Sequence, residues 1–264
     1  MCVGLLETDD TYVWQPRLER GAECRLRLDI SGLRCISSQE TLAMVEERLK
    51  TFPAKLVFMG SGAFHHLALP LIARQAAKRP LSVLILDRHL DFFSVPPGFV
   101  SCGSWIREVI KLPAVRRVVV IGLVGKAPNL PAKVVALTSQ SWRFLFTRAK
   151  GYFEALLCTG DIYLSVDKDV FAAANTDWGT GELSVAEVLA FLRWCMARRR
   201  LVGVDVCGEV VPRGLWPTVE ERKLIARNER INLTLCRFLR HRNYLLPHGR
   251  GGDRLDRFQL RPTA

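Results

Sequence analysis

One stretch of the sequence places two aspartates and a histidine at alternate positions directly after an apolar run. Asp87, His89 and Asp91 follow the apolar residues 84–86. In an extended backbone alternate side chains point to the same face, so these three side chains can converge. Carboxylate and imidazole groups suit hard to borderline ions such as Mn²⁺, Fe²⁺ or Zn²⁺. We expect a metal site here without a cysteine ligand, which disfavours a thiolate zinc centre.

A second apolar run ends in the same way. Residues 163–166 lead into Asp167 and Asp169, with Lys168 between them. Two carboxylates this close repel each other and raise their own pKa values unless a cation lies between them. By the same alternation, the side chain of Lys168 should turn away from that cation.

Histidines occur at a third place of this kind. Residues 60–66 form a glycine-rich turn after an apolar run and end in His65 and His66. Alone, each segment has an ordinary structural explanation, because an aspartate after a strand often caps a helix. Together they predict one site, since ligands bind at the carboxyl edge of parallel sheets and four carboxylates balance the charge of two divalent ions. The candidate metal ligands are His65, Asp87, His89, Asp91, Asp167 and Asp169.

Runs rich in Val, Leu and Ile alternate with amphipathic stretches from residue 55 onward. This alternation predicts strand–helix units and a mostly parallel sheet covered on both faces. We expect strands at residues 55–59, 81–86, 117–122, 134–137, 162–166 and 201–206. We expect helices at residues 66–78, 104–111, 184–198 and 218–240. Ser184 and Glu187 have capping-box spacing at the start of the third of these helices. Nearer the start, residues 23–30 alternate like a strand and residues 38–49 have a helical pattern.

The composition fits a single α/β domain spanning residues 1–264. With 264 residues, 49% of them hydrophobic, the chain can bury a full core. The formal net charge of +12 comes partly from arginines 198–200 and a tail at 237–261. We interpret these as a helix end and a solvated basic tail, mobile from about residue 243. The tail lacks the interleaved aromatic residues of stacking nucleic-acid binders, so nucleic acid is not an expected partner.

The first residues carry acids and no basic segment before an apolar run, so they do not predict a secretory signal. No apolar run approaches the roughly 18 residues that cross a bilayer. The eight cysteines include no Cys-x-x-Cys pair. We therefore expect a cytoplasmic protein with reduced thiols and no membrane partner.

These motifs resemble those of the arginase and agmatinase family, the ureohydrolases, within the arginase/deacetylase fold. The family's first histidine motif is similar to residues 60–71, its Asp-Ala-His-x-Asp motif to residues 87–91, and its Ser-x-Asp-x-Asp motif to residues 165–169. The resemblance covers about residues 55–212. It implies a three-layer α/β sandwich with a mostly parallel central sheet.

The resemblance also implies an activity. The six candidate ligands would hold two Mn²⁺ ions, with Zn²⁺, Fe²⁺ or Ni²⁺ as alternatives, and a hydroxide bridging the ions would be the nucleophile. The substrate would be a guanidino or amide small molecule with a linear, non-peptide C–N bond. Asp91 would orient the nucleophile as a catalytic residue. Family members are often oligomers, so a homo-oligomer is expected.

Three departures from the family pattern affect the substrate side. Phe64 replaces the acid that usually precedes the first histidine, so a partner that orients His65 must come from elsewhere. Cys102 stands where the family often has a histidine, which makes it the candidate proton carrier, provided its pKa allows. Glu209 is the candidate for substrate binding, although it lies one residue further from Asp205 than the family spacing.

Two other functions remain open from the sequence. A single-zinc deacetylase of the same fold would use one Asp-x-His pair and one later aspartate, with His65 and His66 resembling its histidine pair. Asp91 and Asp169 count against it, because they complete a second metal shell that one zinc would not need. The other alternative is a non-catalytic, metal-stabilised binding protein with a basic surface.

Overall fold

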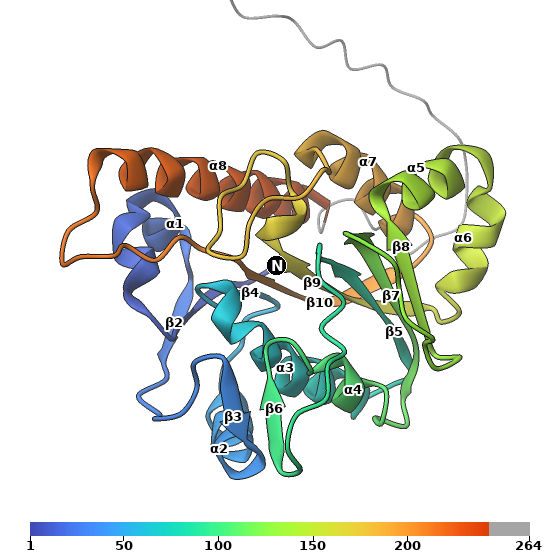
Figure 1. The fold of residues 1–264 in the computed structure, drawn as a ribbon, viewed down its shortest axis with the longest axis horizontal. Coiled ribbons are helices and arrows are strands. Elements are labelled where there is room, and N and C mark those ends of the chain that lie inside the picture. Colours follow the sequence, from blue (N-terminus) through green and yellow to red (C-terminus); the bar gives the residue numbers. More distant parts are fainter. Residues whose placement is uncertain (243–264) are drawn as a thin grey trace, which may run out of the picture.

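The computed structural model describes residues 1–242, and the predicted basic tail from about residue 243 lies outside this range. Eight parallel strands form the central sheet of the described part. They are β1 (Val3–Glu7), β2 (Cys24–Arg27), β4 (Leu56–Phe58), β5 (Leu81–Leu86), β7 (Val115–Leu123), β8 (Val134–Thr138), β9 (Asp161–Asp167) and β10 (Arg200–Cys207). Their order across the sheet is β2–β1–β4–β10–β9–β5–β7–β8 (Figure 1). The predicted mostly parallel sheet is confirmed.

Helices cover both faces of this sheet (Figure 1). One face carries α1 (Pro16–Gly21), α5 (Ser139–Arg148), α6 (Lys150–Leu156), α7 (Val185–Met196) and α8 (Val219–Arg242). The opposite face carries α2 (Gln39–Leu49), α3 (Ala68–Ala76) and α4 (Ile106–Val109). Beside this second layer, β3 (Ile36–Ser38) pairs with β6 (Phe99–Ser101) in a short antiparallel ribbon. The result is the three-layer α/β sandwich that the motifs predict.

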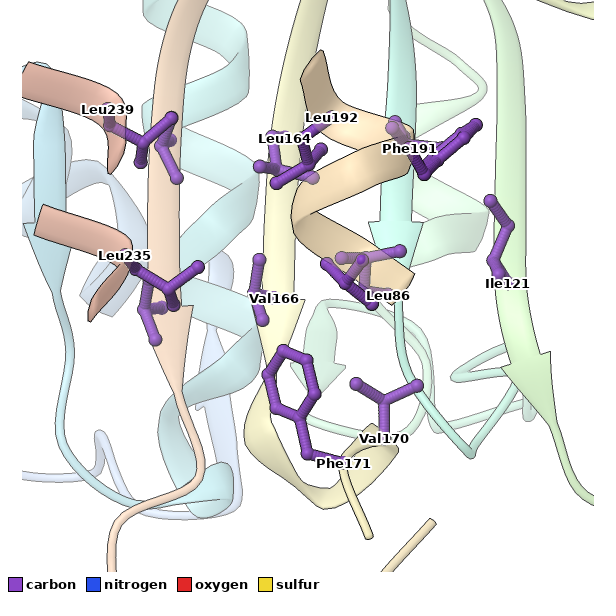
Figure 2. Close-up of a cluster of buried hydrophobic side chains, with 14 of the residues drawn as sticks. Leu86, Ile121, Leu164, Val166, Val170, Phe171, Phe191, Leu192, Leu235 and Leu239 are labelled. Atoms are coloured by element: carbon purple, nitrogen blue, oxygen red, sulfur yellow. The ribbon is translucent and has the colours of Figure 1, made fainter. Parts of the chain in front are cut away.

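Two hydrophobic cores lie on the two faces of the sheet, because alternate residues of each strand point to opposite sides. In β5, Leu84 and Leu86 belong to the core under α7 and α8, whereas Val83 and Ile85 belong to the core under α3. Figure 2 shows Leu86 beside side chains of β9 and α7, with side chains of α8 farther along the same core. A sheet buried on both faces explains why its strands are continuous apolar runs.

The element boundaries follow local chemistry. β5 occupies its predicted residues, and Ser184 and Glu187 form the predicted capping box at α7. The helix expected at 66–78 is shorter: a 3₁₀ turn spans Gly62–Leu67, and α3 begins only at Ala68. Pro70 explains this start, because it has no N–H to donate to the carbonyl four residues earlier. Among residues 1–242, no helix combines the length and the apolar character needed to cross a membrane.

The strands that position the candidate site end level with one another. Phe58 of β4 is in register with Val206 of β10, Val206 with Val166 of β9, and Val166 with Leu86 of β5. The residues that directly follow these positions therefore share one edge of the sheet. This C-terminal edge is where ligands bind in open parallel sheets.

Candidate metal centre

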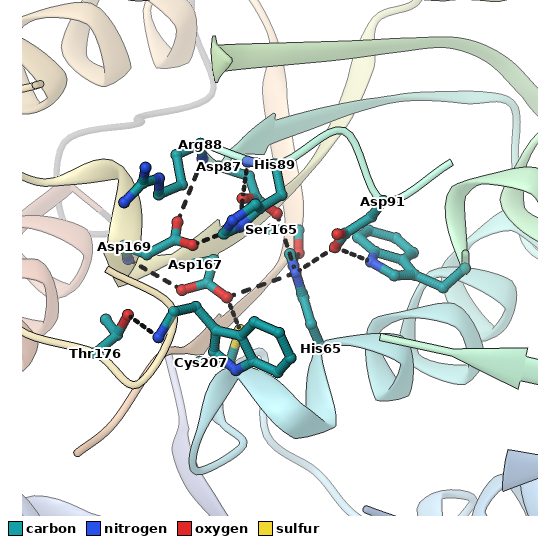
Figure 3. Close-up of polar contacts among 12 residues, drawn as sticks. His65, Asp87, Arg88, His89, Asp91, Ser165, Asp167, Asp169, Thr176 and Cys207 are labelled. Atoms are coloured by element: carbon teal, nitrogen blue, oxygen red, sulfur yellow. Dashed lines mark hydrogen bonds and ion pairs between the residues drawn. The ribbon is translucent and has the colours of Figure 1, made fainter. Parts of the chain in front are cut away.

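The predicted ligands meet at the C-terminal edge of the sheet (Figure 3). The segment 87–91 follows β5, and Asp167 ends β9. Asp169 lies in the 3₁₀ turn Lys168–Val170 directly after β9. The 3₁₀ turn after β4 supplies the first histidine. The structure thus brings together every candidate of the set, namely His65, Asp87, His89, Asp91, Asp167 and Asp169.

One group of possible ligands surrounds His65. Its Nδ1 atom lies 3.0 Å from Oδ2 of Asp91, 3.3 Å from Oδ2 of Asp87 and 3.8 Å from Oδ2 of Asp167. All four side chains are buried. The oxygens of Asp87 and Asp91 thus form one possible ligand group with His65, and that of Asp167 forms another with His65 and Cys207.

A second group surrounds His89 and shares Asp87 with the first. Nδ1 of His89 lies 2.8 Å from Oδ2 of Asp169 and 3.5 Å from Oδ1 of Asp87. The backbone N–H of His89 also donates to Oδ1 of Asp87 at 2.6 Å. His89 is 40% exposed, whereas the two carboxylates are buried. It is therefore the ligand candidate that faces the solvent side of the cluster.

The donor atoms of both groups suit divalent metal ions. Nδ1 of His65 and Oδ2 of both Asp87 and Asp169 are buried and have no hydrogen-bond partner within residues 1–242. A buried polar atom without a partner costs roughly 1–3 kcal/mol. Such atoms directed at one another are expected where a cation satisfies them. The residues present therefore fit a pair of hard to borderline divalent ions.

The carboxylates raise one another's pKa values, as their spacing predicts. Burial raises the pKa of Asp169, and the charges of Asp167 and Asp87 raise it further. Burial and the charge of Asp87 likewise raise the pKa values of Asp91 and Asp167. Asp87 is the exception. Its burial also favours the neutral acid, but the proximity of His65 and His89 and the backbone N–H of His89 lower its pKa below the ordinary value.

A buried hydrogen-bond chain orients the first histidine. Oγ of Ser165 lies 3.0 Å from Nε2 of His65 and donates to Oδ1 of Asp205 at 2.6 Å. Because its proton goes to Asp205, the hydroxyl accepts from Nε2–H of His65. The lone pair of Nδ1 then points at the carboxylates. Ser165 and Asp205 thus supply the partner that Phe64 cannot.

Trp105 fixes the other side of the cluster. Its indole Nε1 donates to Oδ2 of Asp91 at 2.8 Å, and its ring centroid lies 4.8 Å from that of His65. Asp91 has a φ of 48°, in the left-handed region that non-glycine residues seldom adopt. Such strain persists only where the surroundings hold it, and it clusters at functional sites.

The structure corrects the expectation that no cysteine belongs to the cluster. Cys207 is buried, and its Sγ–H donates to Oδ2 of Asp167 at 3.4 Å. It follows Asp205 by two residues on β10, so both side chains point to the same face. Burial, followed by the charges of Asp167 and Asp205, raises the pKa of Cys207 well above its ordinary value. It is therefore a thiol that donates to a carboxylate rather than a thiolate.

A cavity of about 130 Å³ opens onto the cluster. Beyond the ligand candidates, its lining consists of Gly62, Phe93, Cys102, Gly103 and Trp178. Cys102, the candidate proton carrier, thus lines the cavity beside the ligand candidates. However, burial and the charge of Asp91 raise its pKa to about 12, which makes the thiol a poor acceptor near neutral pH.

Glu209 does not line this cavity. Its carboxylate is 1% exposed and forms an ion pair with Lys168, which is fully buried. Gln15 and Asn232 also donate to it, at 2.6 and 2.7 Å. Lys168 therefore turns away from the ligands as alternation predicts, but it occupies the carboxylate that was the candidate for substrate binding.

The model of the arginase family matches residues 28–214. The chain belongs to the arginase family. An uncharacterized protein of Thermotoga maritima is 30% identical over 222 residues, which cover 84% of this chain and 85% of that protein. The predicted resemblance to arginases and agmatinases is therefore confirmed.

Solved structures share the fold of this arginase-family chain. Proclavaminate amidino hydrolase from Streptomyces clavuligerus is 21% identical, with a TM-score of 0.60 over 89% of this chain and 79% of that chain. Arginase from Bacillus subtilis is 15% identical, with a TM-score of 0.59 over 88% and 98%. Formiminoglutamase from Trypanosoma cruzi, solved with Mn²⁺, is 13% identical, with a TM-score of 0.56 over 89% and 92%.

Three residues of the centre escaped the sequence analysis. Trp105 and Trp178 lie outside the strands, so no strand pattern predicts their positions. They reach the ligands only because the folded chain brings their segments to the sheet edge. Cys207 had a usable signal, because Asp205 and Cys207 share a strand face. Recognising it required knowing that β10 lies beside β9.

Proposed function

We propose that the chain is a binuclear, Mn²⁺-dependent hydrolase of a linear, non-peptide C–N bond in a guanidino or amide small molecule. The observation that carries this proposal is the pair of ligand groups that share Asp87. The first comprises His65, Asp87 and Asp91, and the second comprises Asp87, His89 and Asp169. Membership of the arginase family supports the same chemistry.

In this proposal Asp167 joins the first group, because its Oδ2 also faces Nδ1 of His65. Two Mn²⁺ ions, when held by these residues, would lower the pKa of a water molecule at the centre and polarise the substrate. Four aspartates would balance their charge. The sharing of Asp87 supports two ions over the single zinc of a deacetylase, which would use Asp87, His89 and one later aspartate and leave the other group, with His65 and Asp91, without a metal.

The chain's own residues would position the attacking water and the substrate. Asp91 is the candidate acceptor for the proton of the water. Trp105 holds the Oδ2 atom of Asp91 in place through a hydrogen bond. Ser165 keeps His65 in one orientation. The water oxygen would bond to the substrate carbon, the C–N bond would break, and the leaving nitrogen would take up a proton. Cys102 lies at the cavity, but its raised pKa makes it a weak candidate for moving that proton.

Hydrolysis that depends on added metal would test this proposal. Protein freed of metal with a chelator should release no amine, ammonia or urea from a panel of guanidino and linear amide compounds. Addition of Mn²⁺ should restore turnover of at least one of them. Turnover that is unaffected by the chelator would contradict the proposal. A chain that binds an RNA probe salt-sensitively and turns over nothing would favour the binding-protein alternative.

A further inference from the structure

The end of β10 carries a glycine where a side chain would project toward the candidate metal centre. Gly208 follows the strand with a φ of +86°, a conformation that favours glycine. A Cβ atom at this position would lie 2.4 Å from Oδ1 of Asp167 and 2.8 Å from the backbone nitrogen of Lys168. Position 208 also has the spacing from Asp205 at which the family motif carries its substrate-binding glutamate. No side chain, and hence no carboxylate, fits there.

The neighbouring glutamate cannot take over this role while its present contacts hold. Oε1 of Glu209 contacts Lys168 and accepts from Asn232 of α8, and its Oε2 accepts from Gln15. Nζ of Lys168 also donates to Oδ1 of Asn232 at 3.2 Å. Each charge is therefore matched within the protein. Separating a buried ion pair leaves uncompensated charge in the interior, so a substrate cation would not readily displace Lys168.

Among the described residues, this cavity offers no further carboxylate. Its lining contains three of the aspartates proposed as ligands, Asp87, Asp91 and Asp167, and both ligand histidines, and the remaining residues are glycines, aromatic residues and Cys102. A second hollow of about 270 Å³ shares His89 and Phe93 with it. The other charged residues around that hollow are Arg88 and Lys126, both cationic. The charge of the aspartates would already be balanced by the metal ions, so a cationic substrate group would find no free carboxylate. It would also be repelled by Arg88 and Lys126 around the second hollow.

From this arrangement we propose that the hydrolysable group of the substrate is uncharged, a carboxamide rather than a guanidinium or amidinium. The inference rests on the proposed function and narrows it. In the reaction, the water oxygen bonds to the amide carbon and the C–N bond breaks. Both protons of the water end on the departing nitrogen, so the products are a carboxylate and an ammonium ion. Phe93 and Trp178 supply apolar surface for the rest of the substrate.

Benzamide and benzamidine test the charge preference, because they have the same shape and differ in charge at the group that approaches the metals. Calorimetric titration of the Mn²⁺-loaded protein should give benzamide an affinity higher by about tenfold, since the cation finds no carboxylate partner. Tighter binding of benzamidine would overturn the inference. Metal content measured on the same sample separates the two proposals. Bound metal with a benzamidine preference overturns only this one, whereas absence of metal overturns both.

Two variants of an exposed cavity residue provide a matched control. Phe93 is 72% exposed, so its replacement should leave the fold intact. Phe93→Glu adds the missing carboxylate and should shift the affinity ratio toward benzamidine by about fivefold, the effect of an exposed ion pair. The glutamine in Phe93→Gln has nearly the shape of the glutamate but no charge. This variant should leave the ratio of the benzamide and benzamidine affinities unchanged. Equal shifts in both variants would contradict a charge-based preference.

A double variant tests Glu209 directly. Lys168→Met combined with Glu209→Gln removes both buried charges together. Because neither group faces the cavity, the benzamide to benzamidine ratio should stay as in the wild type. If benzamidine binding weakened in a double variant with unchanged circular dichroism, Glu209 would be a cation receptor and the inference would be wrong.

Discussion

Two parts of the same sheet edge have different organisation. At the ends of β5 and β9, carboxylates face one another, and several buried nitrogen and oxygen atoms have no hydrogen-bond partner among residues 1–242. At the end of β10, Glu209 is also buried, but Lys168, Gln15 and Asn232 satisfy it completely. The first arrangement gains from an added cation, whereas the second already contains its own. The comparison separates a binding centre from a structural ion pair, although both consist of buried acids.

Loss of the shared carboxylate should have the largest effect. Asp87→Ala removes a ligand candidate from both groups, so metal content should fall below about one ion per chain, with loss of any activity. Elemental analysis of the purified variant checks this. Cys102→Ser is the control, since this thiol is not among the grouped ligands, and it should retain the wild-type metal content. Full metal content in Asp87→Ala would show that Asp87 is not a ligand shared by two metal ions.

Loss of the other carboxylate should instead affect stability. Glu209→Gln leaves the ammonium of Lys168 buried without a counter-charge, which should lower the free energy of unfolding by about 3–5 kcal/mol. Urea denaturation measures this change. Lys168→Met combined with Glu209→Gln removes both charges and should recover most of the stability. If Glu209→Gln were as stable as the wild type, the ion pair would not have the structural role assigned to it.

The hydrogen-bond chain behind His65 should have a smaller effect on metal affinity. Asp205→Asn weakens the acceptor that fixes the Ser165 hydroxyl, so Mn²⁺ should bind about 10- to 100-fold more weakly. Competition with a chelating dye measures the affinity. Wild-type affinity in this variant would mean that His65 keeps its orientation without the chain.

The smallest effect is expected at a carboxylate that is not among the ligand candidates. Hydrogen bonds from Arg143 lower the pKa of Glu187 from 4.5 to about 2, although burial opposes this. A lowered folded-state pKa contributes stability that is present above pH about 4.5 and lost as the pH falls toward 2. Glu187→Gln should therefore be less stable than the wild type at pH 7, and the difference should shrink on acidification. Unfolding curves across this pH range test it, and metal content should not change.

The sequence predicted the ligand positions better than their surroundings, for a physical reason. Asp87, His89 and Asp91 follow β5 directly, so the end of the strand brings them to the sheet edge. The two-residue period does not continue there, because the chain bends at residues 88–89 and Asp91 has a left-handed φ, so His89 and Asp91 belong to different ligand groups. Lys168 turns away as predicted, but it does so within a 3₁₀ turn and not in an extended strand. The contacts of Glu209 were not predicted, because they depend on Asn232, which reaches the site only when α8 packs over the sheet.

The order of the strands in the sheet was the second feature that could not be predicted from the sequence. Seven of the eight strands of the sheet were expected from the sequence and β1 was not, and no local pattern showed that β10 lies between β4 and β9, which precede it in the chain. This crossover brings Cys207 beside Asp167 and Asp205 behind Ser165. Local sequence patterns do not show which strands are neighbours in the sheet. The hydrogen-bond partners of His65, Ser165 and Asp205, could therefore not be predicted from the sequence.

Metal content per chain tests the central claim most directly. Wild-type protein purified without chelator, reloaded with Mn²⁺ and freed of excess metal should contain about two ions per chain by elemental analysis. One tightly held Zn²⁺ in a parallel loading, with no retained Mn²⁺, would contradict the binuclear centre and favour the deacetylase alternative. Absence of any retained metal would contradict a metal centre at this edge altogether.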